Sequence, residues 1–365
     1  MTISLCMIVK NEEDTLGNCL SSVAGVFDEI NIIDTGSTDR TVEIAQKYTD
    51  RIFYFDWIYD FSAARNFSFS KATMEYIMWL DADDILLEEN RKKLLNLKKT
   101  LPKDIDYVVT PYNCTHDEQG NPLYVIKRER IVKRARNFKW TETIHESLDV
   151  SGKSFYADIA IKHNHIKDEE LHEIKMARNF EVLNIKKESG KPFSTRDMYY
   201  YARSLHELDR HEESIVWFKN LIDALPAGER PQVDAYTLLH KSYVALGQYE
   251  SALMCLLGVE ASYSGRAEFY CCLGEFFKDT VKDYETAIKY YKKALNCKIT
   301  NDMTSINMDF YYNIPYSMLA GCYLGSGDYE NAILNYKAAL KFSPYDEDVK
   351  ALVLKLEKLV SILNK

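Results

Sequence analysis

One stretch of the sequence, residues 76–84, limits the fold of the whole chain more than any other. The run from Ile77 to Leu80 is apolar throughout and leads directly into Asp81, Asp83 and Asp84. A short apolar run of this kind is typical of a strand buried on both faces, in the middle of an α/β sheet. Such sheets bind ligands outside the carboxyl ends of their strands. We therefore expect these acids at the edge of a binding crevice.

The spacing of Asp81 and Asp83 allows two interpretations. In an extended chain these side chains would point the same way, with the small Ala82 between them. Two carboxylates at a sheet edge suit Mg²⁺ or Mn²⁺, which take one or two carboxylates together with substrate phosphates. Alternatively, the acids cap a helix and fill its first turn, where Asp is also favoured. The motif alone does not decide between the two.

Strands and helices alternate through the first half of the chain, which predicts βαβ units and a mainly parallel sheet. The expected strands are Ile3–Val9, Glu29–Asp34, Arg51–Phe55, the strand ending at Asp81, and Asp106–Tyr112; Leu123–Ile126 and Arg130–Lys133 are expected to form a hairpin. A helix is expected over Arg40–Tyr48, capped by Ser37 or Thr38. Asn11, Asp34 and Asp81 each follow a strand, so they should converge on one edge.

Composition excludes several classes of protein. The 365 residues include 46 basic and 55 acidic ones, a net charge of −9 that gives no footprint for nucleic acid. No signal peptide or membrane span is visible, and the eight cysteines lack a Cys-x-x-Cys pair, so we expect reduced thiols in a cytoplasmic protein. Neither a P-loop nor a dinucleotide-binding glycine motif is present.

The second half of the chain is built from repeats. After a helical connector over 167–190, a Tyr-Glu-x-Ala pattern recurs at Tyr249, Tyr284 and Tyr329, with a weaker copy at His211. The recurring offsets predict about four tetratricopeptide repeats over 191–365, with Leu352–Leu363 in a capping helix. Aromatic side chains at these offsets are expected to form the core, and the concave surface of such an array to bind a partner.

Four motifs in the first half carry a family resemblance: Met7–Glu13, Ile33–Asp39, Ser62–Asn66 and Trp79–Asp84. In this order they resemble the motif set of family 2 glycosyltransferases with the GT-A fold. The resemblance implies a GT-A domain over 1–166, completed by the connector helix 167–190. It also implies an inverting, metal-dependent transferase that uses a nucleotide-sugar donor.

The resemblance also implies roles for individual residues. Val9, Asn11 and Glu12 would line the nucleoside pocket, Asp34 would hold the base or ribose, Arg65 the diphosphate, and Asp81 and Asp83 the sugar-nucleotide and the metal. From the residues alone, Asp34 could equally form a turn and Arg65 could lie on a helix surface. Asp39 and Asp84 are expected to be capping or first-turn acids.

An inverting transfer needs a base that takes the proton of the acceptor. By resemblance to transferases linked to tetratricopeptide repeats, Glu146 is our choice, and Glu142 is the alternative. His145 could be a metal ligand or could orient Glu146. The GT-A core often ends in a metal-binding histidine, for which His163 is the first candidate and His165 the second.

The resemblance favours UDP over GDP or dTDP as the nucleotide. Relatives with the same domain pairing include glycosyltransferases of bacteriocin peptides, so the expected acceptor is a Ser or Cys side chain of a peptide or protein recruited by the repeats. Two alternatives stay open: a binding scaffold with a non-catalytic transferase domain, and a transferase acting on a glycan. The repeats could also dimerise the protein, and no membrane partner is expected.

Overall fold

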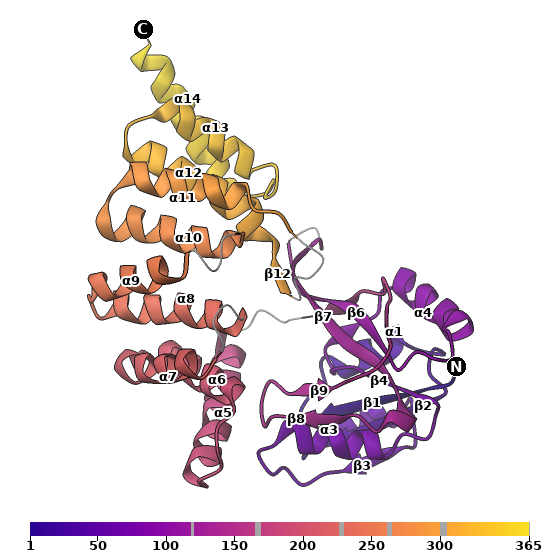
Figure 1. The fold of residues 1–365 in the computed structure, drawn as a ribbon. Helices are drawn as coiled ribbons and strands as arrows, with labels where there is room; N and C mark the ends of the chain where they lie inside the picture. The colour runs from indigo at the N-terminus through magenta and orange to yellow at the C-terminus, as the bar shows by residue number, and fades with distance from the viewer. Residues whose placement is uncertain (118–119, 165–168, 226–229, 261–264, 300–304, 365) are drawn as a thin grey trace. The chain divides into compact units, whose positions relative to one another are not determined.

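The computed structural model describes residues 1–117, 120–164, 169–225, 230–260, 265–299 and 305–364. The chain forms two compact units: residues 1–116 together with 124–192, and residues 117–123 together with 193–365. Each unit has hydrophobic core clusters of its own. The α/β unit comes first in the chain and the helical repeats follow it (Figure 1), as the sequence predicts.

The N-terminal unit is built on a mixed sheet. Its strands are β1 (Ile3–Val9), β2 (Glu29–Asp34), β3 (Ile52–Tyr54), β4 (Tyr76–Trp79), β5 (Asp84–Ile85), β6 (Tyr107–His116), β7 (Pro122–Lys133), β10 (Ser154–Tyr156) and β11 (Ile161–His163), with β8 (Lys139–Thr141) and β9 (Ser147–Asp149) forming a separate pair. The order is β3-β2-β1-β4-β7-β6-β11-β5, and β10 also pairs with β6. Strands β1 to β4 pair in parallel, whereas β7 is antiparallel to β4. The predicted mixed α/β sheet is confirmed.

Strand β4 lies at the centre of this sheet and is buried on both faces, as expected. Tyr76 and Met78 join the core cluster that also contains residues of helices α1 and α4. Ile77 and Trp79 join the cluster on the opposite face, with Trp140 of β8. The helices of this unit are α1 (Leu16–Ser22), α2 (Thr41–Ala45), α3 (Phe61–Ser70), α4 (Glu88–Thr100) and α5 (Glu169–Glu188), with a 3₁₀ turn over Arg134–Arg136.

Two local predictions in this unit are wrong. The segments Leu123–Ile126 and Arg130–Lys133 do not form a hairpin; both belong to β7, which is one continuous strand next to β6. The residues between the two segments, Lys-Arg-Glu, include no turn former, so the strand continues through them. The turn between β6 and β7 lies around Gly120 instead, which has a φ of 85°.

The other error concerns the cap of helix α2. Asp39 accepts a hydrogen bond from the backbone N–H of Thr41 (3.0 Å), whereas Ser37 and Thr38 do not cap the helix. Both are engaged elsewhere, because the Ser37 hydroxyl accepts from the Asn11 N–H and the Thr38 N–H donates to the Asn11 side chain. Asp39 lies before the helix and accepts from its first N–H, so of the two expected roles, a capping or a first-turn acid, the geometry agrees with the capping one.

The second unit consists mainly of helices, most of which pack against the next helix in sequence. They are α6 (Thr195–Glu207), α7 (His211–Ala224), α8 (Arg230–Ala245), α9 (Tyr249–Glu260), α10 (Ala267–Glu275), the π-helix Phe276–Val281, α11 (Tyr284–Leu295), α12 (Asn313–Gly325), α13 (Tyr329–Ala339) and α14 (Glu347–Leu363), with the short β12 (Ser305–Asn307) and the 3₁₀ helix Met308–Tyr311. The residues that mark the repeats in the sequence, His211, Tyr249, Tyr284 and Tyr329, each open a helix, so the predicted repeat array is confirmed. Within the described ranges no helix is long and apolar enough to cross a membrane.

Candidate active site

Hydrogen bonds join the loops after β1 and β2 at the carboxyl edge of the sheet. Val9 accepts a backbone hydrogen bond from Thr35 (3.0 Å), and the Asn11 side chain accepts one from the Thr38 N–H (2.8 Å). The Glu12 N–H donates to the Thr41 hydroxyl (2.7 Å). Asn11 has a φ of 54°, a left-handed conformation that Asn adopts more readily than most residues.

Asp34 and Glu12 both face this edge. The Asp34 carboxylate accepts hydrogen bonds from the N–H groups of Gly36 and Ser37 (3.2 Å each), so it closes its own turn. Helix α1, which follows the first loop, reaches the acids after β4, since the Cys19 thiol donates to the Asp81 carbonyl oxygen (3.5 Å). Burial raises the pKa of Glu12, and the Asp83 carboxylate raises it further. The predicted convergence of these loops therefore holds, while the nucleoside-binding roles of these residues stay predictions.

The chain turns sharply after β4 instead of continuing as an extended strand. The Asp84 N–H donates to the Asp81 carbonyl oxygen (3.1 Å), and the Asp81 N–H donates to the Asp84 carboxylate (2.9 Å). Because of this turn, the alternation expected for an extended chain does not apply to Asp81 and Asp83. The turn instead divides the acids between two clusters.

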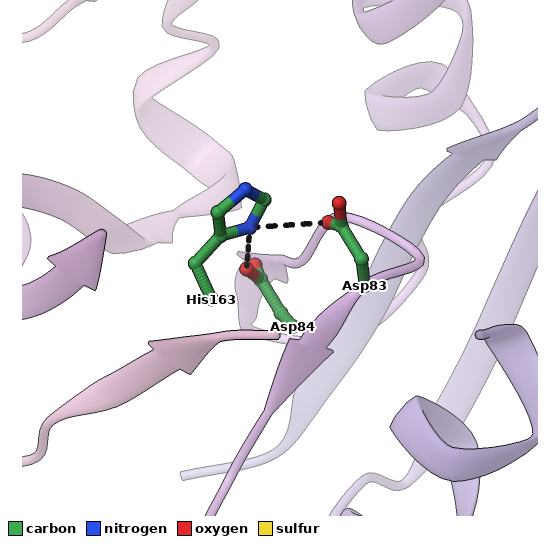
Figure 2. A group of neighbouring side chains, drawn as sticks. All are labelled: Asp83, Asp84 and His163. Carbon is green, nitrogen blue, oxygen red and sulfur yellow. Dashed lines mark ion pairs between the residues drawn. The ribbon is translucent and has the colours of Figure 1, made fainter. Parts of the chain in front are cut away.

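The first cluster joins Asp83, Asp84 and His163, whose side chains face one another in Figure 2. One ligand atom from each lies within 4.8 Å of the others. His163 Nδ1 is 3.3 Å from Asp83 and 3.8 Å from Asp84, and Tyr112 makes a 2.9 Å hydrogen bond with the same nitrogen. The strands bring these residues together, because His163 of β11 is paired with Asp84 of β5.

This cluster has the donor atoms of a divalent-metal site. Asp84 is fully buried, and its Oδ1 accepts no hydrogen bond within the described part of the chain. Burial would lower the pKa of His163, but Asp83 and Asp84 raise it to about 10, so the cluster attracts positive charge strongly. An unsatisfied buried carboxylate oxygen beside a second carboxylate and an imidazole fits a metal ion. His165, the second histidine candidate, lies outside the described residues.

Arg130 binds Asp84 on the buried side of this cluster. Its guanidinium is fully buried, donates to the Asp84 carboxylate (3.0 Å), and lies between the rings of Trp79 and Tyr112, 3.7 and 4.3 Å from their centroids. Asp84 is therefore not a capping or first-turn acid, since helix α4 begins only at Glu88. Sequence reasoning missed Arg130, because it is one of several charged residues in β7 and only the structure shows which of them is fully buried.

The second cluster is centred on Arg65 of α3. Its Nη2 donates to Asp81 (2.7 Å) and its Nε donates to Glu146, and the guanidinium lies 4.9 Å from the ring centroids of both Trp79 and Trp140. Burial alone would lower the pKa of Arg65, but the two carboxylates raise it. Arg65 is thus buried in an ionic network and does not lie on a helix surface.

The same network sets the charge of the two acids. Burial would raise the pKa of Asp81 and of Glu146, but the Arg65 guanidinium outweighs that effect and holds both pKa values below their usual range. Both carboxylates are therefore ionised at neutral pH. Asp81 does not join the group of Asp83, Asp84 and His163, and its role as a metal ligand stays a prediction.

The alternative base candidates lie beside Glu146. Glu142 is partly buried, with a carboxylate 3.9 Å from the Lys186 ammonium group of α5. His145 is exposed and adopts a φ of 47°. Only Glu146 of these three is buried and joined to Arg65.

Comparison with known proteins gives independent information on both units. Residues 4–151 match the model of glycosyl transferase family 2, and residues 315–346 match the tetratricopeptide repeat. The SPbeta prophage-derived glycosyltransferase SunS of Bacillus subtilis is 31% identical over 274 residues, which cover 72% of this chain and 63% of that protein. The chain thus spans less than two thirds of that relative's length.

Other relatives match one part of the chain. A TPR repeat-containing protein of Synechococcus elongatus is 34% identical over 149 residues, which cover 41% of this chain and 36% of that protein. Among solved structures, a thermophilic TPR protein of Thermus thermophilus covers 52% of this chain and 94% of its own, with 21% identity and a TM-score of 0.40.

Proposed function

We propose that the protein transfers a sugar from a nucleotide-sugar donor to a peptide side chain. The match of residues 4–151 to the glycosyl transferase family 2 model and the similarity to SunS support this proposal. One observation carries the proposal. The turn over residues 81–84 contributes Asp81 to the Arg65–Glu146 network and Asp83 and Asp84 to the group with His163. A base candidate and a metal-type ligand group are therefore tied to the same turn.

Asp83, Asp84 and His163 would hold the divalent ion. Mg²⁺ prefers an all-oxygen shell, so the imidazole nitrogen makes Mn²⁺ our choice. When bound, such an ion offsets the negative charge that develops on a diphosphate leaving group. Arg130 binds Oδ2 of Asp84 from the buried side, which leaves Oδ1 of Asp84 toward His163.

Glu146 is our proposed base in an inverting displacement. The acceptor hydroxyl or thiol gives its proton to the Glu146 carboxylate as its oxygen or sulfur forms a bond to the anomeric carbon. The bond from that carbon to the diphosphate oxygen breaks on the opposite face, and the nucleoside diphosphate leaves. Arg65 keeps Glu146 ionised, which is the form that a base needs.

The proposed acceptor and nucleotide follow from the repeats and from the family resemblance. Tetratricopeptide arrays present extended binding surfaces, which supports a peptide acceptor with a Ser or Cys side chain. The resemblance to glycosyltransferases of bacteriocin peptides supports the same choice, and the family resemblance favours a UDP-sugar. No geometric observation favours a glycan acceptor.

Calorimetric titration with UDP-, GDP- and dTDP-sugars tests the proposal. With Mn²⁺ present, one donor class should bind, and EDTA or Asp83→Ala should remove that binding. Asp149→Asn, which changes an exposed acid of the same unit, is the matched control and should bind as the wild type does. If none of the three donor classes binds, the transferase proposal fails, and the scaffold alternative would be tested by peptide capture on the full chain.

Replacing the proposed base separates binding from chemistry. Glu146→Gln should keep donor binding and lower kcat by about 10²- to 10⁴-fold, the usual contribution of a positioned base. Glu142→Gln is the comparison, since it changes the alternative base and should leave kcat within a few fold. Wild-type turnover by Glu146→Gln, with loss of activity in Glu142→Gln, would transfer the role to Glu142.

A further inference from the structure

The guanidinium groups of three arginines lie near the Trp79 ring, but they differ in whether a carboxylate pairs with them. Arg65 donates to Asp81 and Glu146, and Arg130 donates to Asp84. Arg128 forms no salt bridge among the residues that the structure describes. Its guanidinium lies 5.4 Å from the Trp79 ring centroid and makes one long hydrogen bond, from Nη2 to the carbonyl oxygen of Glu146 (3.5 Å).

The sheet directs Arg128 toward the candidate active site. Arg128 and Arg130 are two residues apart on β7, so their side chains lie on the same face of the strand. In the antiparallel pairing of β4 with β7, Tyr76 pairs with Lys133 and Met78 with Ile131. Strand β4 ends at Trp79, one residue beyond the last of these pairs, while β7 extends past it, so Arg128 lies beyond the carboxyl end of β4, at the edge where both ligand clusters lie.

The surroundings of Arg128 favour an incoming anion. The side chain is partly buried, and burial together with the charge of Arg130 lowers its pKa, which marks an environment unfavourable for a second cation. A guanidinium does not lose its proton in a protein, so Arg128 stays charged despite its burial and the nearby charge of Arg130. A phosphate oxygen would supply the missing negative charge, and the planar fork of Arg binds phosphate in a bidentate manner.

Arg65 is less suited to that task than the family resemblance implies. Two carboxylates already engage its Nη2 and Nε, and binding a phosphate would require it to give up Asp81 or Glu146. No such exchange is needed at Arg128, because it has no carboxylate to release among the described residues. Arg65 therefore serves as a positioning residue for Asp81 and Glu146.

We propose that Arg128 binds the diphosphate group of the donor and of the nucleoside diphosphate that leaves, an inference that rests on the function proposed above. The site takes a nucleoside diphosphate through its phosphate oxygens, so Arg128 adds nothing to the recognition of the nucleoside itself. Affinity for UDP should then depend on Arg128, and affinity for uridine should not.

Calorimetric titration of UDP and uridine, both with Mn²⁺, tests this difference. Arg128→Gln removes the charge and should weaken UDP binding about 10- to 100-fold, the usual range for a lost hydrogen bond to a charged group, and leave uridine binding unchanged. Arg134→Gln is the matched control, because it removes an equal charge at an exposed position beyond the other end of β7 and should change neither affinity. Arg128→Met, which keeps an apolar stem over Trp79, replaces the Gln variant if the latter does not fold.

The outcomes distinguish this inference from the proposed function. If the wild type binds UDP and Arg128→Gln binds it equally well, the inference is wrong and the proposed function stands. An equal loss of UDP and uridine affinity would show a structural role and also overturn the inference. A wild type that binds no nucleoside diphosphate would refute both.

Discussion

The two units bury polar groups in contrasting ways. In the N-terminal unit, Arg130 and Asp84 are fully buried, and Arg65 and Glu146 expose 8% and 9% of their surface. Among the described residues of the repeat unit, the buried polar groups are Asp197, Ser204, Ser214, His240 and Ser242. Asp197 is the only acid in that set, and it belongs to the capping box of α6.

This contrast indicates that the N-terminal unit contains a reactive site, whereas the repeat unit is held together by packing. Removing ions from water costs several kcal/mol per ion, and packing alone gives no reason to accept that cost. Clusters of strongly shifted pKa values are characteristic of functional sites. The repeat unit instead relies on small residues facing large ones: Gly274 lies against Tyr291, and Gly325 lies against Tyr284.

Breaking the buried ion pair of the N-terminal unit should have the largest effect on stability. Arg130→Met leaves the Asp84 carboxylate buried without its guanidinium, which should lower the free energy of unfolding by about 3–5 kcal/mol. Urea unfolding followed by Trp fluorescence measures this, since Trp57, Trp79 and Trp140 all belong to that unit.

Two further variants sharpen the comparison. Arg130→Met combined with Asp84→Leu should recover most of the lost stability, because no buried charge is left without a partner. In the repeat unit, Lys337→Met breaks an ion pair of 2.6 Å whose side chains are largely exposed, and should cost about 0–1 kcal/mol. Equal losses from Arg130→Met and Lys337→Met would contradict the distinction between the two units.

Crowding a helix crossing should have the next largest effect, in the repeat unit. A Cβ atom at Gly274 of α10 would lie 2.6 Å from the Tyr291 ring, which is fully buried, so Gly274→Ala should cost about 1–3 kcal/mol. Gly258→Ala in α9 meets nothing within 4 Å and should stabilise by up to about 1 kcal/mol through helix propensity. Thermal unfolding followed by circular dichroism at 222 nm compares the two, and destabilisation by both would count against the crowding argument.

The sequence predicted the repeats well because their signals are local and recur. Tyr249, Tyr284 and Tyr329 open helices as expected, since each repeat carries the same large and small residues at the same offsets. Strands β1 and β2 begin and end where their apolar runs do, so hydrophobic pattern also predicted the edge at which the loops converge.

The arrangement of the site could not be predicted in the same way. Asp84 and His163 meet only because β5 pairs with β11, across about 80 residues of chain, and no local pattern specifies that pairing. Neither the extended nor the helix-capping interpretation of residues 81–84 predicts the turn after β4, whose hydrogen bonds join Asp81 to Asp84. Arg128 and Arg130 had a visible signal, two arginines on one face of a strand, but their partners depend on the antiparallel pairing of β4 with β7.

A metal ion and a proton should compete for the side chain of His163. With its pKa raised to about 10, His163 carries a proton at neutral pH, and a metal ion must displace that proton from Nδ1. Apparent Mn²⁺ affinity should therefore rise about tenfold per pH unit below pH 10, which is about 1.4 kcal/mol per unit. Calorimetric titrations near neutral pH and one unit to either side measure this slope. His163→Asn should bind Mn²⁺ more weakly and with little dependence on pH, and a wild type whose affinity is flat across this range would remove His163 from the ligand group while leaving Asp83 and Asp84 in it.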